Sequence, residues 1–470
     1  MQNIQADYLV IGTGAVGMTF VDTMLDESDA TFVMVDRHHL PGGHWNDAYP
    51  FVRLHQPSSY YGVASTELGS NRIDEAGSNK GYYALASGAE ICAYFEKLKR
   101  ERYLPSGRVQ YFPLCSYDGI GKYHSLLSDQ QHHVDIQRKL VDGTYYKTTV
   151  PSTHMRKFSV EESVSCIAPN ELPKQAINYR QFTILGGGKT AMDTCVWLLD
   201  NGVDPEAMTW VCPRDSWLFN REVTQPGLAF YEQVMEGNIA NIAAMAHATS
   251  VEDLFLRMEA AGTMMRVDPA ITPTMYHYAT LAEGELAQLR RLKHIIRGER
   301  VAKVESNQMI MQSGKQISAT PQTLYVDCTA KAVGFEKFVT KPIFEPNLIT
   351  LQPVFAPLVT YSAAIVAYCE ANIASDEEKN SLCTPVVLAD TPAEWMGSML
   401  GNFANMNAWS QNKPLNRWIR SCRLNPSAAA LKEGAGKAPE HKALFNRIRQ
   451  SMLLAVLNTQ KLIAALPESE

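Results

Sequence analysis

The sequence predicts an α/β fold with two parallel sheets, because one pattern of apolar strand, glycine turn, helix and second apolar strand occurs twice. The first copy covers residues 7–39 and the second covers residues 182–215. With 470 residues, the chain exceeds the size at which a single hydrophobic core stops growing. We therefore expect two such domains, and helical patterns over residues 376–470 predict a third, helical part.

The composition is that of an ordinary folded protein, with 46% apolar residues, 20% charged residues and a net charge of −6. This mild acidity, without a basic stripe, gives no reason to expect nucleic acid as a partner. The sequence has no run of about 18 apolar residues, so we expect no membrane span. Its N-terminus leads directly into a strand without a secretory signal, which indicates a cytoplasmic protein. The oligomeric state is left open.

The nine cysteines are scattered and odd in number, and no two are spaced as C-x-x-C. Such scatter is typical of buried thiols in a reducing compartment. It argues against a metal site and against the paired redox cysteines of a disulfide reductase built on two nucleotide domains. We therefore predict no metal and no catalytic dithiol.

The first glycine turn has the pattern G-x-G-x-x-G, formed by Gly12, Gly14 and Gly17 directly after a predicted strand. The first glycine permits a tight turn, the second lets the backbone approach a pyrophosphate, and the third lets the helix pack closely. The start of the helix presents N–H groups to the phosphates. Asp36 ends the next strand, where an acid accepts hydrogen bonds from ribose hydroxyls. Together these residues predict a Rossmann-like dinucleotide site.

The second turn has the related pattern G-x-G-x-x-A, formed by Gly186, Gly188 and Ala191. No acid ends the strand that follows, and Arg214 instead stands near the expected position of a 2′-phosphate. This arrangement favours NADPH over NADH as the second nucleotide. Lys189 either contacts a phosphate or is solvated at the start of the helix.

The order of elements predicts that the second nucleotide domain is inserted into the first. Residues 301–319 alternate apolar and polar positions between turn residues, as antiparallel hairpins do. A strand is predicted from Leu324 to Cys328, where we expect the chain to return and complete the first sheet. The terminal helix, residues 443–466, has an apolar face that we expect to dock on the protein. The predicted parts are the first segment of the first domain (1–165), the inserted domain (166–317), the second segment of the first domain (318–375) and the helical C-terminal region (376–470).

Two glycine turns in this order, together with the segments "GGHW", "GGGKTA" and "YVDCTA", resemble the class B flavin-dependent monooxygenases. The resemblance implies that the first turn binds FAD and the second a nicotinamide dinucleotide. In that family a Gly-Gly-x-Trp segment lies along the flavin, and Gly42, Gly43 and Trp45 match it. Tyr49 and Pro50 match the tyrosine–proline step that often follows.

Several departures from the family pattern bear on function. Asp36 stands where these enzymes usually carry Glu, and "DCTA" at residues 327–330 stands in place of Ala-Thr-Gly. The Baeyer–Villiger fingerprint is absent, since His154 lacks its glycine, and this weakens the case for ester-forming ketone oxidation. An asparagine expected near the flavin is not evident, and His55 and Gln56 occupy that vicinity. These two are our candidates for catalytic contacts, although His55 fits a core or loop histidine equally well.

The resemblance implies a FAD-dependent, NADPH-reduced monooxygenase that transfers one oxygen atom of dioxygen from a 4a-peroxyflavin to a small organic substrate. Because the flavin carries the chemistry, no acid–base pair is required in the sequence. An NAD(P)H oxidase or dehydrogenase with the same two sites and a non-enzymatic flavin-binding redox sensor remain alternatives. The residues assigned to cofactor binding are Gly12, Gly14, Ala15, Val16, Gly17, Asp36, Arg37, Gly43, His44, Trp45, Gln56, Gly186, Gly188, Lys189, Thr190, Ala191, Arg214, Ala330 and Gln352.

Overall fold

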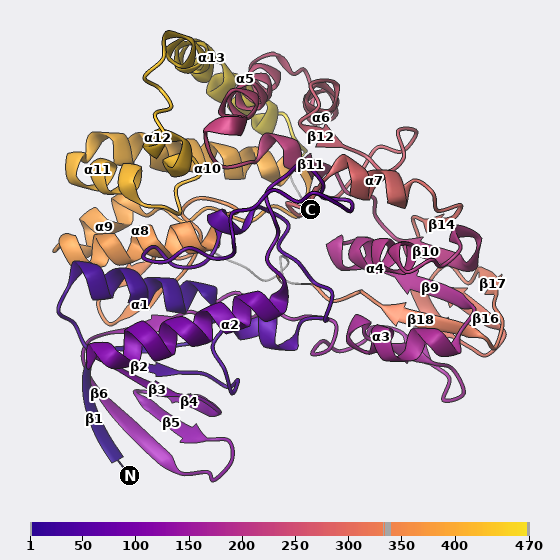
Figure 1. Ribbon diagram of the computed structural model, residues 1–470, viewed down its shortest axis with the longest axis horizontal. Coiled ribbons are helices and arrows are strands. Elements are labelled where there is room, and N and C mark those ends of the chain that lie inside the picture. The colour runs from indigo at the N-terminus through magenta and orange to yellow at the C-terminus, as the bar shows by residue number, and fades with distance from the viewer. Residues whose placement is uncertain (1, 332, 334–339, 468–470) are drawn as a thin grey trace.

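The structure is a computed structural model that describes residues 2–331, 333 and 340–467. Figure 1 shows two sheets side by side, the first at lower left and the second at right, with helices above them. Each sheet contains one of the two glycine turns. The predicted α/β fold with two nucleotide-type sheets and a helical C-terminal region is confirmed.

The first sheet is built around the first copy of the repeated pattern. β1 lies between β2 and β6 and runs parallel to both. The order across the sheet is β19, β20, β6, β1, β2, β3, and the hairpin of β4 and β5 joins it through β6. Its strands are β1 (Gln2–Ile11), β2 (Phe32–Val35), β3 (Val109–Phe112), β4 (Cys115–Gly119), β5 (Lys122–Ser125), β6 (Gln131–Asp142), β19 (Phe344–Glu345) and β20 (Leu348–Thr350).

Both faces of β1 are covered, which explains why the strand is apolar along its length. Tyr8 and Val10 belong to a core shared with the helices on one face, whereas Leu9 belongs to the core on the opposite face. That opposite core includes Tyr123 of the hairpin. The helices of the first face are α1 (Ala15–Glu27), α2 (Gly88–Leu98) and α8 (Val359–Asn372).

The second sheet is parallel throughout, in the order β14, β10, β9, β18, β8. The predicted hairpins form a separate sheet of β17, β16, β15 and β7, which packs against the second sheet. The second-sheet strands are β8 (Cys166–Ile167), β9 (Gln181–Leu185), β10 (Met208–Cys212), β14 (His294–Arg297) and β18 (Thr323–Asp327). The hairpin strands are β7 (Ser159–Val160), β15 (Val301–Val304), β16 (Gln308–Met311) and β17 (Gln316–Ser318), and the helices are α3 (Leu172–Gln175), α4 (Lys189–Asp200) and α7 (Glu283–Leu289).

One expectation about this topology is wrong. The strand predicted from Leu324 exists as β18, but it pairs with β9 and β8 in the second sheet and does not complete the first. The chain returns to the first sheet only at β19 and β20, so the expected boundary at residue 318 falls within the second unit. The reason is that a strand buried on both faces has the same apolar pattern in either parallel sheet.

An insertion between β10 and α7 is not indicated by any pattern in the sequence. It contains a small sheet and two helices, and its Trp217 and Phe255 form a core with Trp395 of the C-terminal region. The final helix, α13, packs lengthwise on α5 of the insertion, which gives the helical layer at the top of Figure 1. The elements of the insertion are β11 (Leu218–Asn220), α5 (Tyr231–His247), α6 (Val251–Ala260), β12 (Met264–Met265) and β13 (Thr280–Leu281).

The predicted C-terminal helices are present, and the last one packs on the protein through Ala455 and Leu462, with Met452 and Ile463 beside them. Leu453 and Leu457, which belong to the expected docking face, are instead exposed. No helix in the described ranges is both long and apolar enough to cross a membrane. The helices are α9 (Asp376–Leu382), α10 (Pro392–Gln411), α11 (Lys413–Ser421), α12 (Ala428–Lys432) and α13 (Pro439–Ala464). Short helical turns are η1 (Gly43–Asp47), η2 (Ser58–Tyr60), η3 (Lys99–Tyr103), η4 (Leu104–Ser106), η5 (Pro169–Glu171), η6 (Ala176–Asn178), η7 (Pro205–Ala207), η8 (Arg221–Val223) and η9 (Leu228–Phe230).

Candidate cofactor sites and their junction

The first glycine turn has a geometry that side chains would prevent. Gly12 follows β1 with a φ of +88°, and a Cβ on Gly17 would stand 2.1 Å from the Gly12 carbonyl oxygen. Helix α1 begins at Ala15 with Gly14 as its N-cap, a residue that has no side chain to bind the first N–H groups. The N–H groups of Ala15 and Val16 therefore suit an anion, and the turn fits the pyrophosphate of a dinucleotide.

The Gly-Gly-His-Trp segment lies directly against this turn. A Cβ on Gly43 would stand 2.9 Å from the Cα atom of Gly14, so only glycine permits this approach. The indole N–H of Trp45 donates to the Tyr61 hydroxyl at 2.9 Å. Burial lowers the pKa of His44 to about 4, so its imidazole is neutral. Sequence and structure thus agree that this segment adjoins the first nucleotide turn.

The C-terminal region holds the loop that contains Tyr61. The Arg423 guanidinium donates to the backbone oxygens of Val63, Ser59 and Tyr61 at 2.8, 2.8 and 2.7 Å. One side chain from beyond α11 therefore binds three alternate backbone oxygens of a loop that contacts Trp45. No pattern in the sequence predicts this contact, because an arginine that binds backbone oxygens has no characteristic spacing from them along the chain.

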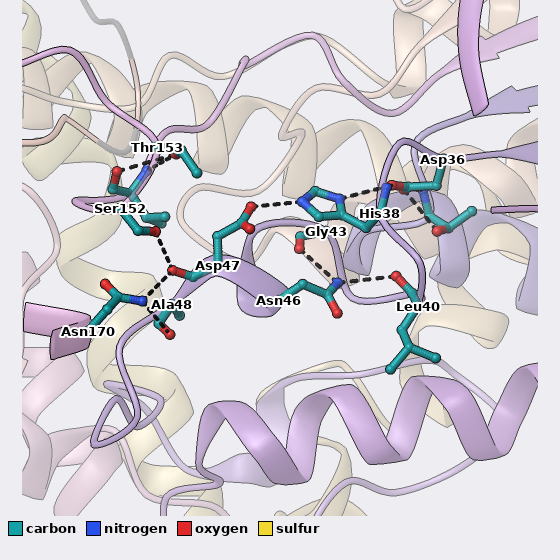
Figure 2. Close-up of polar contacts among 12 residues, drawn as sticks. Asp36, His38, Leu40, Gly43, Asn46, Asp47, Ala48, Ser152, Thr153 and Asn170 are labelled. Carbon is teal, nitrogen blue, oxygen red and sulfur yellow. Dashed lines mark hydrogen bonds and ion pairs between the residues drawn. The ribbon is translucent and has the colours of Figure 1, made fainter. Parts of the chain in front are cut away.

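Asp36 ends β2 as predicted, but both of its carboxylate oxygens already have partners within the chain. Oδ2 accepts hydrogen bonds from the N–H and the hydroxyl of Thr13, at 2.5 and 2.9 Å. Oδ1 accepts from the N–H and Nδ1 of His38, at 2.8 and 2.9 Å (Figure 2). A carboxylate has about four acceptor sites, and Asp36 is only 6% exposed. A ribose hydroxyl could bind Asp36 only by displacing one of these donors.

His38 connects Asp36 to a second carboxylate. Its Nε2 lies 2.7 Å from Oδ2 of Asp47, at the end of η1 (Figure 2). The hydrogen bond to Asp36, with the further one to Asp47, raises the pKa of His38 to about 9, so the ring is cationic at neutral pH. We call Asp36, His38 and Asp47 the His38 bridge. The backbone oxygen of Asp47 accepts from Ser152 at 2.6 Å and from Asn170 at 3.0 Å.

The second glycine turn also fits a dinucleotide phosphate. A Cβ on Gly186 would stand 2.6 Å from the carbonyl oxygen of Cys328, and one on Gly187 would stand 2.6 Å from that of Arg214. In contrast, a Cβ on Gly188 would have no heavy atom within 4 Å. Gly188 is the N-cap of α4, so the N–H groups of Lys189 and Thr190 have no acceptor within the helix and suit an anion.

Lys189 is neither solvated nor free at the start of α4. Its side chain is 11% exposed and forms ion pairs with Asp193 and, at 3.2 Å, with Glu285 of α7. The hydroxyl of Tyr49, which follows the Gly-Gly-His-Trp segment, donates to Asp193 at 2.7 Å. The first unit therefore contacts the second near the start of α4, the helix that follows the second glycine turn.

A buried arginine, Arg221, lies at the same contact between the two units. We call Lys189, Asp193, Arg221 and Glu285, with Tyr49, the junction. Arg221 has a fully buried side chain that pairs with Glu285 and donates to the backbone oxygens of His55 at 2.8 Å and Thr280 at 3.0 Å. It also donates to the amide oxygen of Asn79 at 3.0 Å. Although burial opposes ionisation of Glu285, the charges of Lys189 and Arg221 lower its pKa to about 2. The junction thus contains two cations and two carboxylates.

The structure places the catalytic candidates His55 and Gln56 at the same junction. Both are half-buried, and the backbone of His55 is held by Arg221. Burial, reinforced by the charges of Lys189 and Arg221, lowers the pKa of His55 to about 3. Its imidazole is therefore neutral at physiological pH and can both donate and accept a hydrogen bond.

Arg214 has a partner where a phosphate was expected. Its guanidinium forms a bidentate ion pair with Asp390, at 3.1 and 3.0 Å. Asp390 also pairs with His277, and this hydrogen bond together with Arg214 holds the pKa of Asp390 well below its usual range. A 2′-phosphate can therefore bind Arg214 only in competition with an ionised carboxylate.

The two remaining assigned residues lie on different sheets. Ala330 follows β18 in the second sheet, two residues after Cys328, whose carbonyl oxygen lies against Gly186 of the second glycine turn. Gln352 follows β20 in the first sheet, and its amide donates to the backbone oxygen of Lys341 at 2.8 Å. Close to it, the hydroxyl of Thr350 is buried and lacks a hydrogen-bond partner among the described residues. An orphaned donor at the carboxyl end of a parallel strand fits a cofactor at that edge.

Several residues of the junction and the bridge were missed by sequence reasoning. Asp193 was detectable, because it stands four residues after Lys189 on one helix face. Glu285 and His38 carry no such signal, since their partners depend on contacts between distant segments. Among the described residues, no group of His, Cys, Asp and Glu side chains is placed to bind a metal ion. The nine cysteines are free thiols.

Comparison with known proteins identifies relatives of this chain, although no protein-family model matches it. The uncharacterized proteins Rv2000 of Mycobacterium tuberculosis and Mb2023 of Mycobacterium bovis are each 45% identical over 430 residues. Those matches cover 92% of this chain and 79% of each relative.

Solved structures share the fold at low sequence identity. The open crystal structure of cyclohexanone monooxygenase superimposes with a TM-score of 0.50 at 11% identity, over 87% of this chain and 98% of that one. A flavin-containing monooxygenase from Stenotrophomonas maltophilia gives a TM-score of 0.43 at 12% identity, over 87% and 99%. The chain belongs to the family of these mycobacterial proteins, and its fold is that of flavoproteins with two dinucleotide-binding domains.

Proposed function

We propose that this protein is a flavin-dependent oxidoreductase that binds FAD at the glycine turn before α1 and NADPH at the glycine turn before α4. We further propose that it transfers one oxygen atom of dioxygen to a small organic substrate. The observation that carries the proposal is the junction, where Tyr49 and His55 contact α4 and η8. Transfer of hydride from a nicotinamide to a flavin requires adjoining sites, and direct contact between the two units that carry the glycine turns supports such an arrangement.

The chain's own residues bind and orient the cofactors in this proposal. FAD, when bound, accepts hydride from the nicotinamide and reacts with dioxygen. The N–H groups at the starts of α1 and α4 bind the two pyrophosphates. His55 and Gln56 supply neutral polar groups at the junction, because the low pKa of His55 keeps its ring uncharged. The free thiols are consistent with a reducing compartment such as the cytoplasm.

Rapid-mixing spectroscopy tests this function. The purified protein is loaded with FAD, reduced by NADPH without oxygen and then mixed with oxygenated buffer. An oxygenase should show a lag before the oxidised-flavin spectrum returns, and it should release less hydrogen peroxide than the NADPH it consumes when substrate is present. Immediate reoxidation with one peroxide per NADPH would instead establish an NAD(P)H oxidase. Failure to bind FAD would overturn the proposal as a whole.

Substitution of Gly188 by valine should block reduction by NADPH while FAD remains bound. The valine side chain has room in the folded protein, but it fills the space in front of the α4 N–H groups. We expect the rate of flavin reduction at a fixed NADPH concentration to fall by about a hundredfold or more, as for the loss of two charge-assisted hydrogen bonds. Gly397→Val is the matched control, because Gly397 also has no heavy atom within 4 Å and lies in α10. Equal rates for both variants would move the nicotinamide site elsewhere.

Substitution of Arg214 by alanine should raise KM for NADPH by about tenfold or more and leave KM for NADH nearly unchanged. The reason is that only NADPH has a 2′-phosphate to exchange for Asp390. Asp390→Asn should act in the opposite direction and lower KM for NADPH, because it removes the competing charge. Steady-state kinetics with both nucleotides measures these effects. Parallel changes for NADPH and NADH would remove Arg214 from phosphate recognition.

A further inference from the structure

The His38 bridge limits the capacity of Asp36, the acid that follows β2, to accept hydrogen bonds from a ligand. In a Rossmann-type site that acid is expected to accept hydrogen bonds from the ribose. Here Thr13 and His38 already use about four acceptor positions on Asp36. The carboxylate is buried, so it cannot rotate toward a ligand without losing charge-assisted hydrogen bonds.

The bridge ends on the segment that covers the first glycine turn. Asp47 terminates η1, which begins at Gly43, and Gly43 stands against Gly14. Within this segment, the amide of Asn46 donates to the backbone oxygens of Leu40 and Gly43, at 3.1 and 3.0 Å (Figure 2). The position of η1 over the turn therefore depends on a charge-assisted contact at its end and on two amide hydrogen bonds from Asn46.

The same segment is attached to the second unit. The Asp47 backbone oxygen accepts from Ser152 and from Asn170 of η5, and Asn170 also donates to the oxygen of Ala48 at 3.2 Å. One hydrogen-bonded path thus runs from β2 of the first sheet through His38 to the start of the second unit (Figure 2). Release of His38 would loosen both the cover of the first turn and this attachment.

We propose that His38 is a positioning residue of the first nucleotide site. Its imidazolium, held between Asp36 and Asp47, fixes residues 43–47 against the glycine turn and takes the place of a contact between Asp36 and the adenosine ribose. The identity of the ligand, FAD, rests on the proposed function, and FAD binding is the quantity that the test measures. The bridge itself rests only on the contacts of the three side chains.

The bridge is sensitive to pH in a defined direction. The ionisable groups that face His38 are Asp36 at the end of β2 and Asp47 and His44 of η1. Because the folded protein raises the pKa of His38 to about 9, the bridge is complete below the ordinary pKa of histidine. It is lost as the pH rises through about 9, when a neutral ring can donate to only one carboxylate.

The test compares His38→Asn with His39→Asn, a matched control at the exposed neighbouring histidine. Titration of FAD into the apoprotein, followed by flavin fluorescence, gives Kd from pH 6 to pH 10. We expect His38→Asn to weaken FAD binding by about tenfold or more at neutral pH, as for the loss of one charge-assisted hydrogen bond. Wild type and His39→Asn should lose affinity as the pH passes about 9, and His38→Asn should lack this dependence.

A double variant separates the bridge from direct ribose binding by Asp36. If Asp36 acts through His38, then Asp36→Asn combined with His38→Asn weakens FAD binding no more than Asp36→Asn alone. If Asp36 binds the ribose, the two effects add, and His38→Asn with an intact Asp36 retains near-normal affinity. Additive effects, or an unchanged pH profile in His38→Asn, would overturn the proposal.

Hydrogen–deuterium exchange keeps the failure of this inference distinct from failure of the proposed function. In the apoprotein, the amides of residues 43–47 should exchange at least several-fold faster in His38→Asn than in wild type and His39→Asn. Unchanged exchange would overturn the bridge, whatever FAD does. Faster exchange in a protein that binds no FAD would support the positioning role of His38 and would overturn FAD as the ligand of this site.

Discussion

Substitution of Arg221 by methionine should lower the free energy of unfolding by about 3–5 kcal/mol, as when one partner of a buried ion pair is removed. Arg221 has no exposed side-chain surface, and its loss leaves Glu285 with a buried charge balanced only by Lys189. The backbone oxygens of His55 and Thr280 also lose their donors. Urea denaturation measures the change in the free energy of unfolding. In hydrogen–deuterium exchange of the variant, the amides of the junction should be the first to exchange.

The matched control is Arg257→Met, which removes an exposed arginine from a pair with Asp253 on one face of α6. This change should cost less than about 1 kcal/mol, because surface ion pairs contribute little. Adding Glu285→Leu to Arg221→Met should recover part of the lost stability, since it removes a buried carboxylate that has lost one of its two cationic partners. A loss of less than about 1 kcal/mol for Arg221→Met would mean that water reaches the junction.

Substitution of Gly17 by alanine should abolish FAD binding and lower the stability by about 1–3 kcal/mol, the usual cost of overpacking. The added methyl group would stand 2.1 Å from the carbonyl oxygen of Gly12, so α1 must move away from β1. The helix N-terminus then no longer faces the phosphate position. Flavin fluorescence and thermal unfolding measure the two effects.

Gly14→Ala provides a comparison at the same turn. There the methyl group would meet only Gly43, at an ordinary contact distance of 3.6 Å, so stability should be nearly unchanged. FAD binding should still weaken, because the methyl group lies where the backbone must approach a pyrophosphate. Normal FAD binding by Gly17→Ala would show that the first turn is not the nucleotide site.

The two nucleotide sheets were predictable because their signals are local. Each glycine turn sits between a strand and a helix, and spacing alone reveals which glycine permits the turn and which permits packing. The partner of a strand is not a local property. Leu324 lies in a strand with the same pattern that a return to the first sheet would have, and only its neighbours assign it to the second.

The roles of charged residues were harder to predict than the fold. Asp36 and Arg214 occupy the expected positions, yet their side chains bind His38 and Asp390. A sequence motif states which group stands at a position, whereas the partner depends on segments that fold against it. The junction illustrates the same limit, because Arg221 lies within the insertion and Glu285 lies in α7, which follows it, and no motif predicts that the two side chains meet.

During synthesis on the ribosome, β20 joins the first sheet long after the strand beside it has been made. β1, β2 and β6 are complete when residue 142 has been made, but β20, which pairs with residues 140–142 of β6, arrives about 200 residues later. At roughly 5–20 residues per second, β6 presents an open edge for about 10–40 s. An open parallel edge is a template for pairing with another nascent chain. Slow translation between the two sheets should therefore favour aggregation, and chaperone demand should fall once β20 emerges.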